Sequence, residues 1–126
     1  GRFPADPHVL DGAVMLIETS ETLPSASEVG WILRAMGERG LLAAVDAVLV
    51  ARPPASSLED RRDAPARARF RAEQRDAVVE TVGRYNPEAV ICVGVPFGHT
   101  RPQWIVPHGG TMTLDGASHR ITASYA

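Results

Sequence analysis

Residues 90–100 read VICVGVPFGHT, an apolar run that ends in glycine, histidine and threonine. Because the run does not alternate between apolar and polar residues, it predicts a β-strand covered on both faces. Pro96 has no N–H group to donate and should end the strand. Gly98 permits unusual backbone angles or a close approach by another segment. His99 then stands at the end of a rigid strand, a good position for a catalytic imidazole, although a single histidine there is more often a polar loop residue.

A second apolar run, AVMLI at residues 13–17, predicts another central strand. Glu18 follows it directly, either as a solvated residue where the sheet stops or as a positioned acid, base or orienter. Ligands and catalytic groups collect at the carboxyl edge of open α/β sheets. Glu18 and His99 are therefore the candidate site residues, and they can meet only if the strands that bear them are neighbours.

The segment after Glu18 predicts a β–α–β unit. Ser25 and Glu28 have capping-box spacing at a helix start, and Gly40 is a natural stop for that helix. Residues 46–51 form the next strand. Such crossovers are nearly always right-handed and join parallel strands. The predicted inner face of the helix consists of Val29, Ile32, Leu33 and Met36.

The second half of the chain predicts another crossover and a hairpin. Residues 55–66 are polar and charged and read as an exposed loop with only Leu58 as an anchor. Residues 67–85 predict a long helix that leads into the strand at residue 90. Residues 111–114 and 120–123 predict a closing β-hairpin. The fold class is therefore α/β, with a mostly parallel central sheet.

Composition limits the possible functions. The 126 residues suggest one domain with a net charge of −2, which gives no case for nucleic acid or an anionic membrane as partner. All 13 basic residues are arginine, so no lysine can form a Schiff base. The only cysteine, Cys92, excludes an intrachain disulfide and should be a buried, inert thiol. Histidine spacing predicts no metal site, and no apolar run has the length of a membrane helix. We expect a cytoplasmic protein without a cofactor.

Four segments carry a resemblance to a known family. Residues 16–21, LIETSE, followed by a helix after a proline, resemble the start of the carboxy-terminal domain of the LD-carboxypeptidase family of serine peptidases. Residues 93–100, VGVPFGHT, together with Pro107 and a following glycine, resemble its histidine motif. Residues 70–75 also match, and the resemblance extends over nearly the whole chain. The residues of the two motifs resemble the branch that includes the microcin C immunity peptidases more than the muropeptide-recycling enzymes.

The resemblance implies a swivelling β/β/α domain and a Ser-Glu-His triad divided between two domains. The nucleophilic serine would belong to an amino-terminal domain that this chain does not contain, which makes the chain alone inactive. Glu18 would orient the imidazole, and His99 would act as general base and then general acid. The implied substrates are small peptides or peptidyl-nucleotides, either a muropeptide L,D-bond or a microcin C-like aminoacyl-nucleotide. Ser20 and Ser25 lie near Glu18 in sequence, but neither is on a nucleophile elbow.

Two positions depart from the family pattern. Arg101 stands where an acidic residue is expected after Gly-His-Thr, and Ala51 stands where glycine is expected before a basic residue. Both departures concern substrate preference or loop shape more than the triad. Two alternatives remain: a ligand-binding module without catalysis, and a homodimer formed through the face that the other domain would cover. Exposure of Trp31 or Trp104 on that face would favour self-association.

Overall fold

The computed structural model of the chain describes residues 6–125. The start of the chain, residues 1–12, is rich in proline, aspartate and glycine and reads as an incoming linker. Residues 1–5 of it lie outside the described range. The elements in chain order are η1 (Pro7–Leu10), β1 (Val14–Ile17), α1 (Ala26–Glu38), β2 (Ala47–Ala51), α2 (Ala64–Tyr85), β3 (Val90–Val95), β4 (Met112–Asp115) and β5 (Arg120–Ala123).

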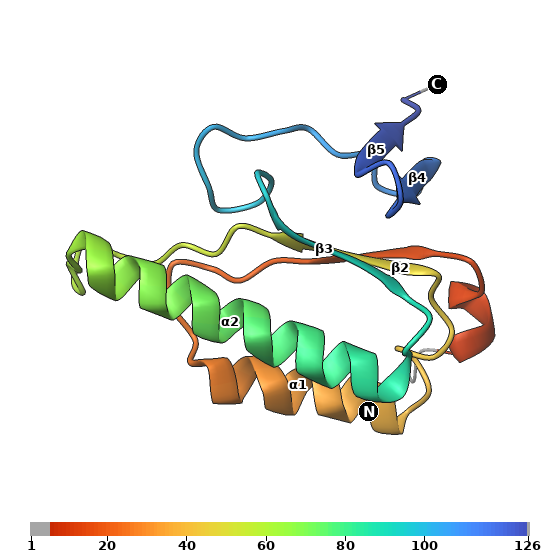
Figure 1. Ribbon diagram of the computed structural model, residues 1–126, viewed down its shortest axis with the longest axis horizontal. Helices are drawn as coiled ribbons and strands as arrows, with labels where there is room; N and C mark the ends of the chain where they lie inside the picture. The colour runs from red at the N-terminus through yellow and green to blue at the C-terminus, as the bar shows by residue number, and fades with distance from the viewer. Residues whose placement is uncertain (1–5, 126) are drawn as a thin grey trace.

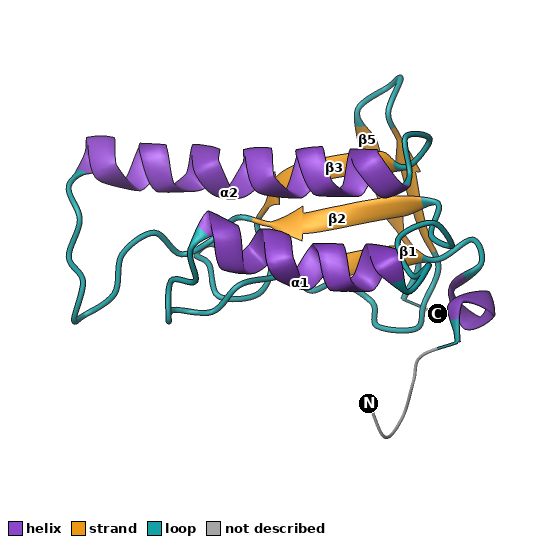
Figure 2. Ribbon diagram, turned by 90° about the horizontal axis from the view of Figure 1, so that it is seen from below, coloured by secondary structure: helices purple, strands orange, loops and turns teal. Residues whose placement is uncertain are grey.

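The elements form three layers, which Figure 1 shows from the side. The middle layer is a parallel sheet with strand order β1-β2-β3. Helices α1 and α2 cover one face of the sheet, and the antiparallel hairpin β4–β5 lies over the other. This β/β/α arrangement confirms the predicted fold class. All three sheet strands run toward the end of the molecule at which α2 begins, as Figure 2 shows.

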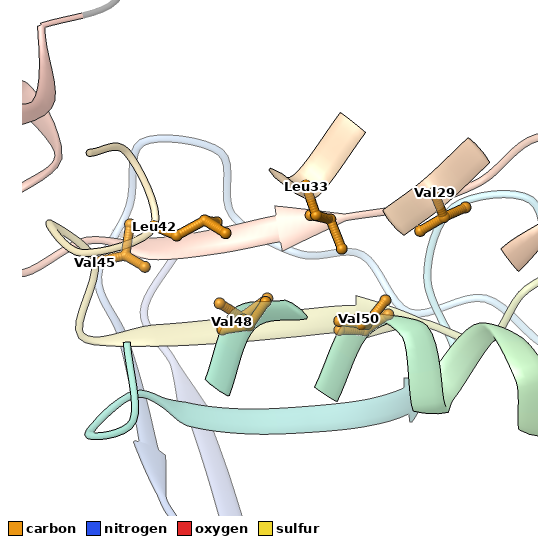
Figure 3. Packing of buried hydrophobic residues seen from close by; sticks show 8 residues of the cluster. Val29, Leu33, Leu42, Val45, Val48 and Val50 are labelled. Carbon is orange, nitrogen blue, oxygen red and sulfur yellow. The ribbon is translucent and has the colours of Figure 1, made fainter. Parts of the chain in front are cut away.

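Strand β2 forms the centre of the core. Because alternate side chains of a strand point to opposite faces of the sheet, β2 contributes to the packing on both faces. Val48 and Val50 face the helices and pack with Val29 and Leu33 of α1 (Figure 3). Leu49 faces the hairpin instead and joins a second cluster. Both Val48 and Leu49 are fully buried. The hairpin-side cluster contains Leu49, Ala51, Val95 and Phe97, with Val14, Leu16, Cys92, Val106, Met112, Leu114 and Ile121 packed against it.

Helix α1 begins as predicted, with a complete capping box between Ser25 and Glu28. Its predicted inner face was wrong at Ile32, which is 63% exposed, while Gly37 is buried. Gly37 lies at a close crossing with α2. A Cβ at Gly37 would lie 2.3 Å from the ring of Tyr85, so the glycine lets the helices approach closely and takes a place on the inner face.

Helix α2 begins at Ala64 instead of residue 67, because Asp63 caps it by accepting from the N–H of Ala66 and a proline occupies its first turn. The loop before it is also better anchored than predicted. Leu58 is 82% exposed and anchors nothing, whereas Ala55 is buried. Hydrogen bonds of the Ser56 and Ser57 hydroxyls with the Asp60 backbone hold the loop together.

Two of the predicted central strands proved to be edges of the three-stranded sheet. Only β2 is buried throughout, and β1 is half-buried. In β3, Val93 and Gly94 are exposed, so the expectation of a strand covered on both faces was wrong. A fully buried strand and a half-buried edge strand can have equally apolar sequences, so the apolar run alone did not distinguish them. Within residues 6–125, no helix has the length and apolar character needed to cross a membrane.

Candidate active site

The strand register brings three chain segments to one edge of the sheet. Ile17 pairs with Val50, so Glu18 comes level with Ala51, which in turn pairs with Val95 of β3. Parallel strands end on the same side, so the residues after β1, β2 and β3 all emerge there. The strands that bear Glu18 and His99 are not neighbours, contrary to the sequence expectation, because β2 lies between them.

The loop after β3 closes the gap across the end of β2 and brings His99 to Glu18. One oxygen of Glu18, Oε2, accepts the backbone N–H of His99 at 3.1 Å and lies 3.3 Å from Nδ1 of its ring. The Glu18 contact therefore fixes both the loop and the imidazole. A carboxylate on Nδ1 selects the tautomer whose Nε2 can accept a proton. The two side chains remain partly exposed, at 48% for His99 and 42% for Glu18.

Gly98 makes this contact possible. Its φ of +68° lies in the left-handed region, which favours glycine. A Cβ at Gly98 would lie 1.6 Å from Oε2 of Glu18, which no packing can accommodate. The sequence suggested both properties of this glycine, but the group that approaches it is a side chain instead of a backbone segment.

Glu21 stands on the other side of the ring. Its Oε2 lies 3.3 Å from Nε2 of His99, which is the nitrogen that a general base must present to its substrate. The imidazole thus lies between two carboxylates that come from one short loop after β1. Glu21 is also the more exposed of the two, at 68%. A flexible, solvated carboxylate can leave Nε2 when another group approaches, whereas Glu18 is held by two contacts.

Arg52, the first residue after β2, binds the loop that follows β3 and contains His99. Its backbone N–H donates to the carbonyl of Val95 at 2.7 Å. Its guanidinium donates from Nε to Oγ1 of Thr100 at 2.9 Å and from Nη2 to the carbonyl of Arg101 at 2.6 Å. These bonds tie the residues after His99 to the central strand. Arg52 therefore positions the loop that carries the imidazole.

The hydroxyl groups of the nearby serines are engaged elsewhere. Ser20 shares a hydrogen bond with Thr22, and Ser25 is part of the helix cap with Glu28. Within the described residues, no serine hydroxyl is hydrogen-bonded to the His99 ring. Cys92 is half-buried on β3, away from this edge of the sheet, and burial raises the pKa of its thiol. The described part of the chain thus brings a carboxylate and an imidazole together, with no serine hydroxyl hydrogen-bonded to the imidazole.

An open cavity of about 880 Å³ lies in front of the imidazole. Its lining includes Glu21, His99 and the exposed Leu58.

The model of the LD-carboxypeptidase C-terminal domain matches residues 2–114. The chain belongs to this family. The family resemblance recognised in the sequence is therefore confirmed. The match to the LD-carboxypeptidase C-terminal domain includes β1 with Glu18 and β3 with His99, and it ends within the hairpin.

A solved structure has the same fold as this LD-carboxypeptidase C-terminal domain. It is the MccF-like protein from Streptococcus pneumoniae in complex with AMP, which is 23% identical and superposes with a TM-score of 0.72. The alignment covers 98% of this chain and 31% of the other, so the chain spans about a third of that protein's length. No curated protein sequence matches the chain.

Sequence reasoning assigned Glu18 and His99, and the structure brings them together. Sequence reasoning gave no role to Glu21 or Arg52. A signal existed for both: Arg52 directly follows a buried strand, as Glu18 does, and Glu21 shares the loop of Glu18. Treating every ionisable residue at the carboxyl edge of the sheet as a candidate would have included Arg52 and Glu21.

Proposed function

We propose that this chain is the Glu- and His-bearing half of a serine peptidase that cleaves an amide bond with a Ser-Glu-His triad. The observation that carries the proposal is the carboxylate of Glu18 on Nδ1 of His99 at the carboxyl edge of the sheet. Membership of the LD-carboxypeptidase C-terminal domain family supports it. The nucleophile is a serine of a second domain that docks against the cavity containing His99.

The mechanism follows the roles of a serine triad. The serine oxygen attacks the amide carbon while Nε2 of His99 takes the hydroxyl proton. Glu18 holds the ring and stabilises the imidazolium that forms. The tetrahedral intermediate then expels the amine, which receives the proton from His99, and leaves an acyl-enzyme. Water attacks this ester with His99 again as base, which releases the acid and restores the serine.

Glu21 must leave Nε2 before this cycle begins. The serine hydroxyl and the Glu21 carboxylate need the same position beside the imidazole, and only the serine can donate a proton there. Docking of the nucleophile domain therefore displaces Glu21 into the open cavity. The exposure of Glu21 makes the displacement inexpensive.

The substrate is a small peptide or an acyl-nucleotide. The solved relative with the same fold is an MccF-like protein in complex with AMP, which supports a nucleotide-bearing amide such as a microcin C-like substrate. A muropeptide L,D-bond is the other candidate, because the chain belongs to the LD-carboxypeptidase C-terminal domain family. Both substrates call for the same triad.

The test is His99→Ala in the complete protein, assayed with an aminoacyl-nucleotide amide and with an L,D-linked peptide. Turnover should fall by about three to four powers of ten, with the thermal unfolding curve unchanged. A variant with unchanged turnover rules out His99 as the base. His119→Ala is the matched control, because it removes an exposed imidazole from the hairpin turn, far from Glu18 in the fold.

A homodimer is the second candidate, and one observation favours it. Trp31 and Ile32 are adjacent on α1 and are 69% and 63% exposed. Such an apolar pair on the outer face of a helix is suited to burial against a second copy. Sedimentation of the chain at increasing concentration, with Trp31→Ser as comparison, tests this: a monomer at all concentrations excludes the dimer.

A further inference from the structure

A second cavity at the carboxyl edge of the sheet is strongly basic. It measures about 380 Å³ and lies beside His99, which forms part of its wall together with Thr100. No acidic side chain contributes to this wall among the described residues. The charged groups that line the cavity are Arg52, Arg67, Arg71 and Arg101.

Three of the four guanidinium groups donate to backbone or hydroxyl oxygens, and none of the four contacts a carboxylate within the described residues. Arg67 donates to the carbonyl of Arg62, Arg71 donates to that of Pro53, and Arg52 donates to Thr100 and Arg101. Within residues 6–125, none of the four forms an ion pair. Each guanidinium therefore keeps N–H donors and its full charge available for a ligand.

Two of the three acidic residues of the preceding loop are already engaged, and the third, Glu59, forms no ion pair within the described residues and does not line the cavity. Asp60 forms an ion pair with Arg62, and Asp63 caps α2 through the N–H of Ala66. Arg67 and Arg71 are one helical turn apart on α2, where like charges repel each other. The fold thus gathers positive charge around one cavity without compensating it.

We propose that this cavity binds an anionic group of the substrate, a phosphate or a carboxylate, next to the scissile amide. Guanidinium groups match the planar, two-oxygen geometry of both anions. The identification of this ligand as a group of the substrate rests on the proposed function. Arg101 lies in the same loop as His99, two residues after it, and it also lines the cavity.

Binding is tested without catalysis. The ¹⁵N-labelled chain is titrated with inorganic phosphate, and in a separate arm with acetate, at constant ionic strength. The backbone amides of residues 99–101 and the Nε–H groups of the four arginines should show saturable shifts. Stronger binding of phosphate indicates a phosphate-bearing substrate, and stronger binding of acetate indicates a carboxylate-bearing one.

Variants locate the site. Arg71→Gln and Arg101→Gln should each weaken anion binding about tenfold, as expected for loss of a charge-assisted hydrogen bond. Arg69→Gln removes the same charge from the same helix but does not line the cavity, so it should leave binding unchanged. Shifts spread over the surface, absence of saturation, or equal effects of all three variants would overturn the proposal.

Kinetics in the complete protein separate this inference from the proposed function. Arg101→Gln should raise KM for an anionic substrate at least several-fold and leave its neutral analogue unaffected. An unchanged KM for the anionic substrate in the variant, with hydrolysis intact, rejects the anion site alone. Saturable phosphate binding in a protein without hydrolysis rejects the peptidase and leaves the anion site standing.

Discussion

The middle of β2 and the carboxyl edge of the sheet differ in how side chains are held. Val48 and Leu49 are fully buried between the helices and the hairpin. At the edge, the side chains of Glu18 and His99 remain 42% and 48% exposed, and hydrogen bonds alone fix their positions. The core therefore supplies stability through apolar burial, and the edge supplies geometry for chemistry. Substitutions in the two regions should affect different measurements.

The largest expected effect concerns the two carboxylates on the His99 ring. Glu18→Gln should lower turnover of the complete protein by about three to four powers of ten, because an amide on Nδ1 no longer holds the required tautomer. Glu21→Gln should change turnover by less than about tenfold, since Glu21 leaves the ring before the reaction in the proposed mechanism. Steady-state kinetics of both variants provide the measurement. Equal losses would mean that Glu21 also takes part in catalysis.

The second prediction addresses the core. Leu33→Ala should lower the free energy of unfolding by about 2–5 kcal/mol, because it opens a cavity under Val48 and Val50. Ile32→Ala, one position away on the exposed face of α1, should change stability by less than about 0.5 kcal/mol. Urea unfolding of the chain measures both. In the complete protein at low temperature, neither variant should change KM, and an altered KM would contradict the separation of core and edge.

Gly98→Ala tests whether the edge tolerates a single added methyl group. Left-handed backbone strain alone should cost about 1–3 kcal/mol of stability. The Cβ would also displace the Glu18 carboxylate, so turnover should fall at least about tenfold. Gly109→Ala is the control, because Gly109 has a φ of +74° but open space at its Cβ position. It should lose stability without losing activity, and equal activity losses would refute the steric argument.

The smallest effect is expected at the cap of α1. Ser25→Ala should lower stability by about 1 kcal/mol through loss of the N-cap hydroxyl. The backbone N–H of Ser25 and then its hydroxyl lower the pKa of Glu28. A lowered folded-state pKa adds stability above the unfolded pKa, and this stability is lost as pH falls through the folded value. Unfolding curves between neutral and acidic pH should therefore show a steeper loss for the wild type than for Glu28→Gln.

Local signals predicted the elements of this fold well. The capping box placed the start of α1, the predicted end of the long helix at residue 85 is the end of α2, and the spacing of apolar runs gave the parallel sheet and the hairpin. These signals failed where contacts between residues distant in sequence determine the structure. Helical spacing assigned Ile32 to the core, but it is exposed, and nothing local in the sequence reveals the close contact of Gly37 with Tyr85.

The carboxylate and the imidazole were indicated by the sequence itself, because Glu18 directly follows one apolar run and His99 follows another after Pro96, Phe97 and Gly98. Which strand lies in the middle was decided by tertiary structure alone, since β1, β2 and β3 are all apolar and the strand order depends on how the crossovers pack. The same packing brought Glu21 to the second nitrogen of His99 and Arg52 to the histidine loop. Sequence periodicity reports the faces of single elements, whereas hydrogen bonds between loops depend on where all of the strands end.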